Sequence, residues 1–174
     1  MKNTGDGDAV DVLVDVWVKS AASGTVGTSD ESKIARIPAH ATFYVGGSLA
    51  PDTSAKVKGV GVSVHGGSST LSHRPVPTVT AVRVEPQSRC GMIAGTLRNP
   101  LGHGFDPNAT RLFVVYLNRA ARIISGDYET LADASSTATV APHSTTALSV
   151  TPGPPNTCDP RIVQARFSVS PGFD

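Results

Sequence analysis

The feature that most constrains this chain is a run of valines at every second position near its start. Valine occupies positions 10, 12, 14, 16 and 18, and aspartate stands between them at positions 11 and 15. Side chains of a strand alternate between its two faces, so the valines share one face and the aspartates the other. Leu13 and Trp17 fall on the aspartate face, which is therefore expected to be only partly hydrated. The run is the clearest strand in the sequence.

Similar patterns recur along the chain, separated by polar loops of about ten residues. Extended segments are predicted at 33–45, interrupted by Pro38, and at 60–64, 80–84 (closed by Pro86), 90–97, 137–151 and 163–170. Loops or turns are predicted at 20–32, 48–54, 66–77, 99–108 and 151–156, and a helical turn at 130–136. Roughly eight strands at this spacing are typical of a sandwich or jelly roll and not of βαβ units. We therefore expect an all-β fold, a single eight-stranded antiparallel sandwich (jelly roll) over residues 1–174.

One segment, 108–125, has two readings. Its apolar residues fit helical spacing, and Asn108 is suited to cap a helix start. The stretch from Leu112 to Leu117 is also a bulky run containing Val114 and Val115, and periodicity alone does not settle short apolar runs. We favour a strand from Arg111 to Asn118, followed by a turn or a short helix.

Composition agrees with a turn-rich β protein and narrows the choice of partners. Charged residues make up 17% of the chain, against about 25% in average proteins. The net charge is +1, and Lys56 with Lys58 is the longest basic cluster, so no arginine-rich arm for packaging nucleic acid is expected. No run approaches the roughly 20 apolar residues of a membrane span. No secretory signal is recognised at the start, so we expect synthesis in the cytoplasm and no membrane partner.

No sequence motif indicates a catalytic, cofactor-binding or metal site. The histidines are dispersed, none within five residues of another, and neither H-E-x-x-H nor G-x-S-x-G occurs. We predict surface and loop histidines with no catalytic, cofactor-binding or metal residues, although a metal held by distant histidines stays open. The histidines are His40, His65, His73, His103 and His143. No spacing among the three glutamates (Glu31, Glu85 and Glu129) and the aspartates singles out an acid/base pair.

Basic residues and cysteines allow two readings each. If scattered arginines and lysines gather on one face after folding, that face can contact phosphates, whereas an ordinary solvated surface is the favoured reading. These residues are Lys56, Lys58, Arg74, Arg83, Arg89, Arg98, Arg111, Arg119, Arg122, Arg161 and Arg166. Cys90 and Cys158 are expected to be two buried or half-buried thiols, with a disulfide as the alternative.

Three stretches stand out together: Thr42-Phe43-Tyr44 with the strand ending at Val62–His65, the strand Thr78–Pro86, and Leu148–Cys158 with the closing strand to Pro171. In this order they resemble the coat proteins of small icosahedral plant viruses, the tymovirus type in particular. The resemblance implies an eight-stranded jelly roll without a basic arm. The family's pattern is not matched around Pro86 to Gly95, so none of its RNA-contact residues is carried over.

The leading hypothesis is a structural, self-assembling capsid (coat) subunit, found in the virion, whose partner is itself. Genomic RNA would then be neutralised by the scattered Arg and Lys. Few Lys and Glu residues fit a surface that is covered by other subunits. The alternative is a phage-type decoration protein or a β-sandwich binding module, which predicts a monomer or small ring. A carbohydrate-active enzyme on the same fold is the third hypothesis, and a substrate screen would expose it.

Overall fold

The all-β prediction is confirmed. The computed structural model describes residues 1–20, 24–26, 31–46, 57–85, 91–135, 137–153 and 156–172. Strands account for 52% of the residues, in three antiparallel sheets, and the described part of the chain contains ten strands and one short helix. The chain divides into two compact units. Unit 1 comprises Met1–Lys2, Thr42–Gly47 and Arg74–Asp174, and unit 2 comprises Asn3–Ala41 and Ser48–His73.

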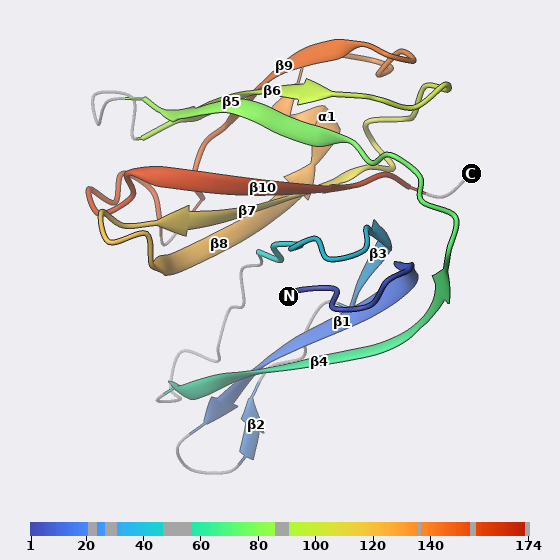
Figure 1. The fold of residues 1–174 in the computed structure, drawn as a ribbon. Coiled ribbons are helices and arrows are strands. Elements are labelled where there is room, and N and C mark those ends of the chain that lie inside the picture. The colour runs from blue at the N-terminus through green and yellow to red at the C-terminus, as the bar shows by residue number, and fades with distance from the viewer. Residues whose placement is uncertain are drawn as a thin grey trace. The chain divides into compact units, whose positions relative to one another are not determined.

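Unit 1 contains two three-stranded sheets that lie one over the other like the layers of a sandwich (Figure 1). The first has the order β5-β6-β9, from β5 (Thr78–Val84), β6 (Ile93–Arg98) and β9 (Thr145–Val150). The second has the order β10-β7-β8, from β10 (Gln164–Ser170), β7 (Arg111–Leu117) and β8 (Ile123–Thr130). These strands confirm the predicted strands at 80–84 and 163–170, and they show shorter strands within or near the predicted segments 90–97 and 137–151.

The hydrophobic core of unit 1 lies between its two sheets. Its buried members come from both sheets and from the loops that close them, namely Ile93, Leu97, Phe105, Leu112, Val114, Tyr116, Leu131, Ala134, Val140, Leu148, Val150, Ile162 and Val169. Helix α1 (Leu131–Ala134) contributes two of them, and the Thr130 side chain caps its start by accepting from the Asp133 amide. The predicted helical turn at 130–136 is therefore confirmed.

Strand β7 is buried on both faces, which explains its ambiguous sequence pattern. Leu112, Val114 and Tyr116 point into the core between the sheets. On the other face Phe113 makes an edge-to-face contact with Phe43 at 5.7 Å between ring centroids and a tilted contact with Tyr128 at 6.3 Å. A strand that is apolar on both faces has no alternation to read. The strand reading of Arg111 to Asn118 is confirmed, and a turn at Asn118–Arg122 follows it in place of a helix.

Unit 2 is one sheet built around the valine-rich strand. β1 (Asp8–Ser20) pairs with β4 (Val57–Thr70) on one side and with β3 (Ser32–Ile37) and β2 (Gly24–Val26) on the other. Val12, Val14 and Ile34 are buried, and Val12 lies opposite Ile34 in the ladder. The predicted apolar face of the first strand is therefore confirmed at its centre. β3 ends directly before Pro38, as the proline indicated.

Two predicted loops proved shorter than expected. The loop at 20–32 includes the short strand β2, and the loop at 66–77 begins only after Thr70 because β4 continues through Gly66 and Gly67. Both glycines have positive φ, +64° and +80°, and Asp11 on the neighbouring strand has φ +55°. Consecutive glycines resemble a loop in the sequence, whereas here they carry a local distortion of the strand pair. The predicted turn at 48–54 lies outside the described residues.

Tyr116 offers a test of the core. Its side chain is fully buried, and its hydroxyl has no hydrogen-bond partner among the described residues. Burying an unpaired hydroxyl costs about 1–3 kcal/mol. We therefore expect Tyr116→Phe to raise the free energy of unfolding by about 1 kcal/mol or more, measured by urea denaturation. As a matched control, Leu97→Ala in the same core should lower it by about 2–5 kcal/mol. A loss of stability in Tyr116→Phe would show that the hydroxyl is paired.

Candidate functional site

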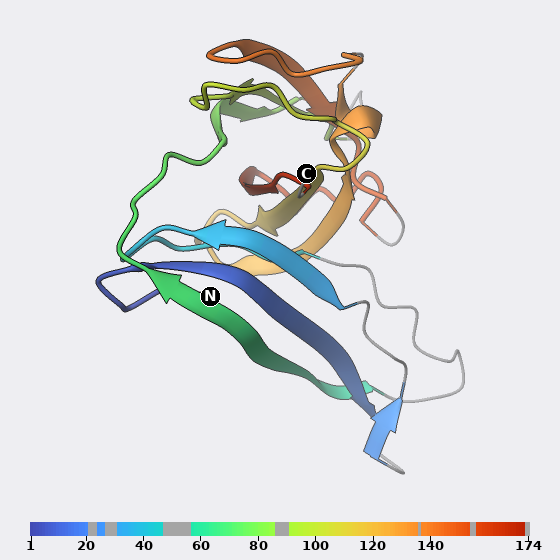
Figure 2. The ribbon, with the colours of Figure 1, turned by 90° about the vertical axis from the view of Figure 1, so that its right-hand side faces the viewer.

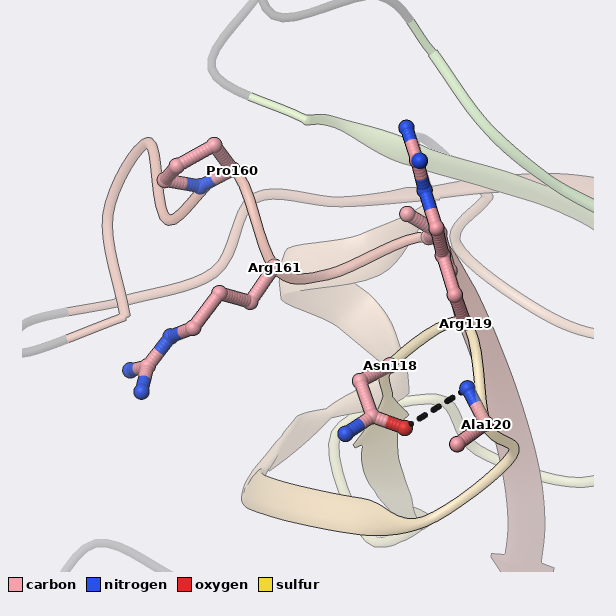
Figure 3. A pocket seen from close by; sticks show the side chains of 6 residues that line it. Asn118, Arg119, Ala120, Pro160 and Arg161 are labelled. Carbon is pink, nitrogen blue, oxygen red and sulfur yellow. Dashed lines mark hydrogen bonds between the residues drawn. The ribbon is translucent and has the colours of Figure 1, made fainter.

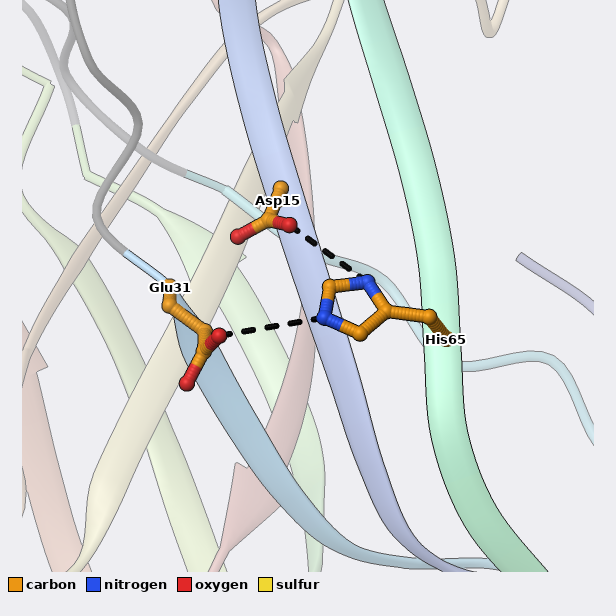
Figure 4. Close-up of side chains that lie close together, drawn as sticks. All are labelled: Asp15, Glu31 and His65. Carbon is orange, nitrogen blue, oxygen red and sulfur yellow. Dashed lines mark ion pairs between the residues drawn. The ribbon is translucent and has the colours of Figure 1, made fainter.

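Three side chains that are far apart in the sequence meet on the polar face of unit 2. Asp15 lies on β1, His65 on β4 and Glu31 directly before β3. Leu13 pairs with His65 and Asp15 with Ser63 in the ladder, so Asp15 and His65 are diagonal neighbours on one face. Figure 4 shows the imidazole between the two carboxylates. Each residue offers one ligand atom, and the three atoms lie within 4.8 Å of one another.

The contacts within this cluster are loose. His65 Nδ1 lies 3.4 Å from Asp15 Oδ2, and His65 Nε2 lies 3.8 Å from Glu31 Oε2. The Ser63 hydroxyl donates to Asp15 Oδ2 at 3.4 Å. Asp15 is the most buried member, with 27% of its side chain exposed, against 47% for His65 and 57% for Glu31. The cluster is therefore accessible to solvent, and Asp15 is its least exposed side chain.

The other histidines belong to no further group of three ligand atoms among the described residues. His40 Nε2 lies 3.4 Å from Asp6, and both side chains are exposed. His73 Nδ1 lies 3.1 Å from the buried Asp8 carboxylate, which also accepts from Arg36 at 2.7 Å and from the Ala39 amide. Sequence reasoning treated all five histidines as isolated. The strand register that joins Asp15 to His65 carries no local signal, so the cluster was missed.

A shallow pocket of about 390 Å³ lies in unit 1, between the turn that joins β7 to β8 and the loop before β10. It is lined by Asn118, Arg119, Ala120, Pro160, Arg161 and Val163. Asn118 fixes the turn by accepting from the amides of Ala120 and Arg122 (Figure 3). Arg161 forms a two-point ion pair with Asp159, and this guanidinium holds the pKa of Asp159 below its ordinary value. The charge of Arg161 is thus already balanced, whereas Arg119 has no ion-pair partner among the described residues.

An acidic group lies on β8. Burial, together with the nearby carboxylates of Asp127 and Asp133, raises the pKa of Glu129 from 4.5 to about 7. Burial likewise raises the pKa of the Tyr116 phenol above its ordinary value, with Asp127 and Glu129 adding to the effect. Glu129 pairs with Leu112 in the ladder, so it lies on the side of the sheet that faces the core.

The sheet of unit 2 has a long edge at β4, which among the described residues pairs on one side only, with β1 (Figure 2). Val62 and Val64 on this strand are 59% and 53% exposed. They lie opposite Val16 and Val14 in the ladder, so they extend the apolar face of β1 to the edge. Ser63 and His65 point to the opposite, polar face, which carries the cluster described above. We call the segment Val57–His65 the β4 edge.

Cys158 corrects the expectation of buried thiols. Its side chain is exposed, and it is disulfide-bonded. Its backbone has φ +59°. Cys90 lies outside the described residues.

No family model, curated protein or solved structure matches the chain. Among the described residues no helix has the length and apolarity to cross a membrane.

Glu129 predicts a pH dependence of stability. Its pKa in the folded protein, about 7, exceeds the ordinary value of 4.5, so the folded state holds this proton more tightly than the unfolded state. The stabilising contribution is complete below pH 4.5 and is lost as the pH rises to about 7. We expect Glu129→Gln to be more stable than the wild type at pH 8, with the difference shrinking as the pH falls to 4.5. Urea denaturation across this range measures it, and a difference independent of pH would contradict the assignment.

Proposed function

We propose that this chain is a structural subunit that assembles with copies of itself into a closed shell, as a viral coat protein does. The observation that carries the proposal is the β4 edge. Within the described part of the chain its backbone is paired on one side only, and Val62 and Val64 expose apolar surface along it. The occupant of this edge is a second copy of the chain.

The β4 edge has little of the protection that monomeric sheet proteins place on their edges. Such proteins blunt an edge with lysines, prolines or inward-pointing charges. The segment VKGVGVSVH contains one lysine and no proline. Strand addition supplies main-chain hydrogen bonds, and the exposed valines supply apolar contacts between the copies. An antiparallel pair of β4 edges is self-complementary, so it gives a two-fold contact of the kind that closed assemblies use.

Fold and composition support the same function. Two antiparallel sheets with a shared core in unit 1 are compatible with a jelly roll, the fold that the sequence resemblance to tymovirus-type coat proteins implies. The low content of charged residues suits a surface that is mostly covered by neighbours. On this proposal the protein resides in the virion.

Genomic RNA is the proposed second partner. A chain with a net charge of +1 neutralises phosphates with individual residues and not with a basic tail. Arg119 in the unit 1 pocket is the best placed of these, because its charge is unpaired among the described residues, whereas Arg161 in the same pocket is bound to Asp159.

The assembly proposal predicts the effect of charges at the β4 edge. Analytical ultracentrifugation and negative-stain microscopy of the wild type should show closed particles. We expect Val62→Lys with Val64→Lys to raise the protein concentration at which particles form at least tenfold, since each buried valine contributes about 1.5–3 kcal/mol. Leu71→Lys is the matched control, because Leu71 is 80% exposed but follows the end of β4; it should assemble like the wild type.

A wild type that stays a monomer or small ring at every salt concentration and pH would exclude the shell and favour a decoration or binding module. If the double-lysine variant forms particles at the same concentration as the wild type, the contact between copies does not lie at the β4 edge.

The RNA proposal predicts a loss of bound nucleic acid from the purified particles. Arg119→Ala should lower the ratio of absorbance at 260 nm to that at 280 nm, and the loss should grow with salt concentration. Arg83→Ala is the matched control, because Arg83 is exposed and already paired with Glu85 at 2.7 Å. An equal loss in both variants would assign the effect to overall charge and not to the pocket.

A further inference from the structure

The cluster of Asp15, Glu31 and His65 is poorly explained as a set of ion pairs. Hydrogen bonds between charged nitrogen and oxygen atoms are about 2.7–2.9 Å long, and elsewhere in unit 2 Arg36 reaches Asp8 at 2.7 Å. The two contacts of His65, at 3.4 and 3.8 Å, are longer than this. The carboxylates therefore surround the imidazole without forming close hydrogen bonds to it.

We propose that Asp15, Glu31 and His65 bind a divalent transition-metal ion of the Zn²⁺ type. Ligand atoms of a tetrahedral zinc ion, each about 2.0–2.2 Å from the metal, lie about 3.3 Å from one another. The separation of His65 Nδ1 from Asp15 Oδ2 is 3.4 Å, and all three ligand atoms fall within 4.8 Å. His65 Nδ1 and Asp15 Oδ2 thus stand at the separation that two ligands of one ion require. Glu31 contacts the other ring nitrogen, Nε2, at 3.8 Å, so its side chain must turn toward the Nδ1 side to complete the site.

The donor set selects the class of metal. An imidazole nitrogen favours zinc and its first-row neighbours over Mg²⁺ and Ca²⁺, which prefer all-oxygen sites, and the two carboxylates supply the negative charge that a divalent ion needs. The Ser63 hydroxyl bonds to Asp15 and so orients a ligand from outside the first coordination sphere. Three protein ligands leave a coordination position for water or for a further donor.

The sheet fixes two of the ligands and leaves the third adaptable. Asp15 and His65 stand on strands that are paired along their length, so their separation is set by the backbone. Glu31 is the most exposed member, and its longer side chain can close on the ion. The bound metal would join β1, β4 and the start of β3, and would stabilise unit 2. The cluster lies on the face opposite to Val62 and Val64, so the inference goes beyond the proposed assembly.

The test is a zinc titration of the full-length protein by equilibrium dialysis and by thermal denaturation. We expect one bound zinc per chain in the wild type, a higher melting temperature with zinc present, and at least tenfold weaker binding in His65→Gln and in Glu31→Gln. Cobalt in place of zinc should give visible absorption bands that the same variants lose. Glu31→Gln is expected to fold normally because that side chain is exposed, so weaker zinc binding in this variant would not be due to misfolding.

The matched control is His40→Gln. His40 lies 3.4 Å from Asp6, the same separation as in the cluster, but belongs to no group of three ligands within the described residues. It should bind zinc like the wild type. No bound zinc in the wild type, equal affinity in Glu31→Gln, or an equal loss in His40→Gln would overturn the proposal.

Discussion

Burial of β7 on both faces is the constraint on which unit 1 depends. Leu112, Val114 and Tyr116 fill the space between the two sheets, while Phe113 holds Phe43 and Tyr128 on the other side. Because both faces of β7 are removed from water on folding, this strand buries apolar area on each side. Burial of apolar area is the dominant favourable term in folding. The flanking strand β10 contributes Ala165, Phe167 and Val169 to the same core, and β8 contributes Tyr128 to the cluster on the other side.

The fold was predictable from the sequence where a strand has one buried face and one solvent-exposed face. The alternation around Val12 and Val14, and again from Ala165 to Val169, predicted both the strand and its buried side. Prediction was weaker where that contrast disappears. Both faces of β7 are buried, so its apolar pattern also fitted a helix. The glycines of β4 resembled a loop in the sequence although they lie within a strand. Such errors arise because periodicity reports the environment of a side chain and not the pairing of the backbone.

The candidate site was not predictable at all. Asp15 was identified in the sequence only as a solvent-facing partner of the valines, Glu31 as one of a few dispersed glutamates, and His65 as an isolated histidine. What joins Asp15 to His65 is the antiparallel register of β1 with β4, and a shift of one residue would send the two side chains to opposite faces. Register is a property of long-range pairing, so no local motif records it. The opposite holds for the turn at Asn118, whose bonds are all local.

The distortion at Gly66 and Gly67 has a consequence for the proposed pairing of copies. An uninterrupted strand edge is a template that can add chains without end, the route to fibrils. At these glycines φ is positive, so the row of outward amides changes direction there, and a Cβ at Gly67 would come within 2.9 Å of the Val10 carbonyl oxygen. Larger residues are thereby excluded and the break is retained. A distortion of this kind twists a strand edge away from further pairing, so a second copy can add its strand only along the regular segment Val57–His65.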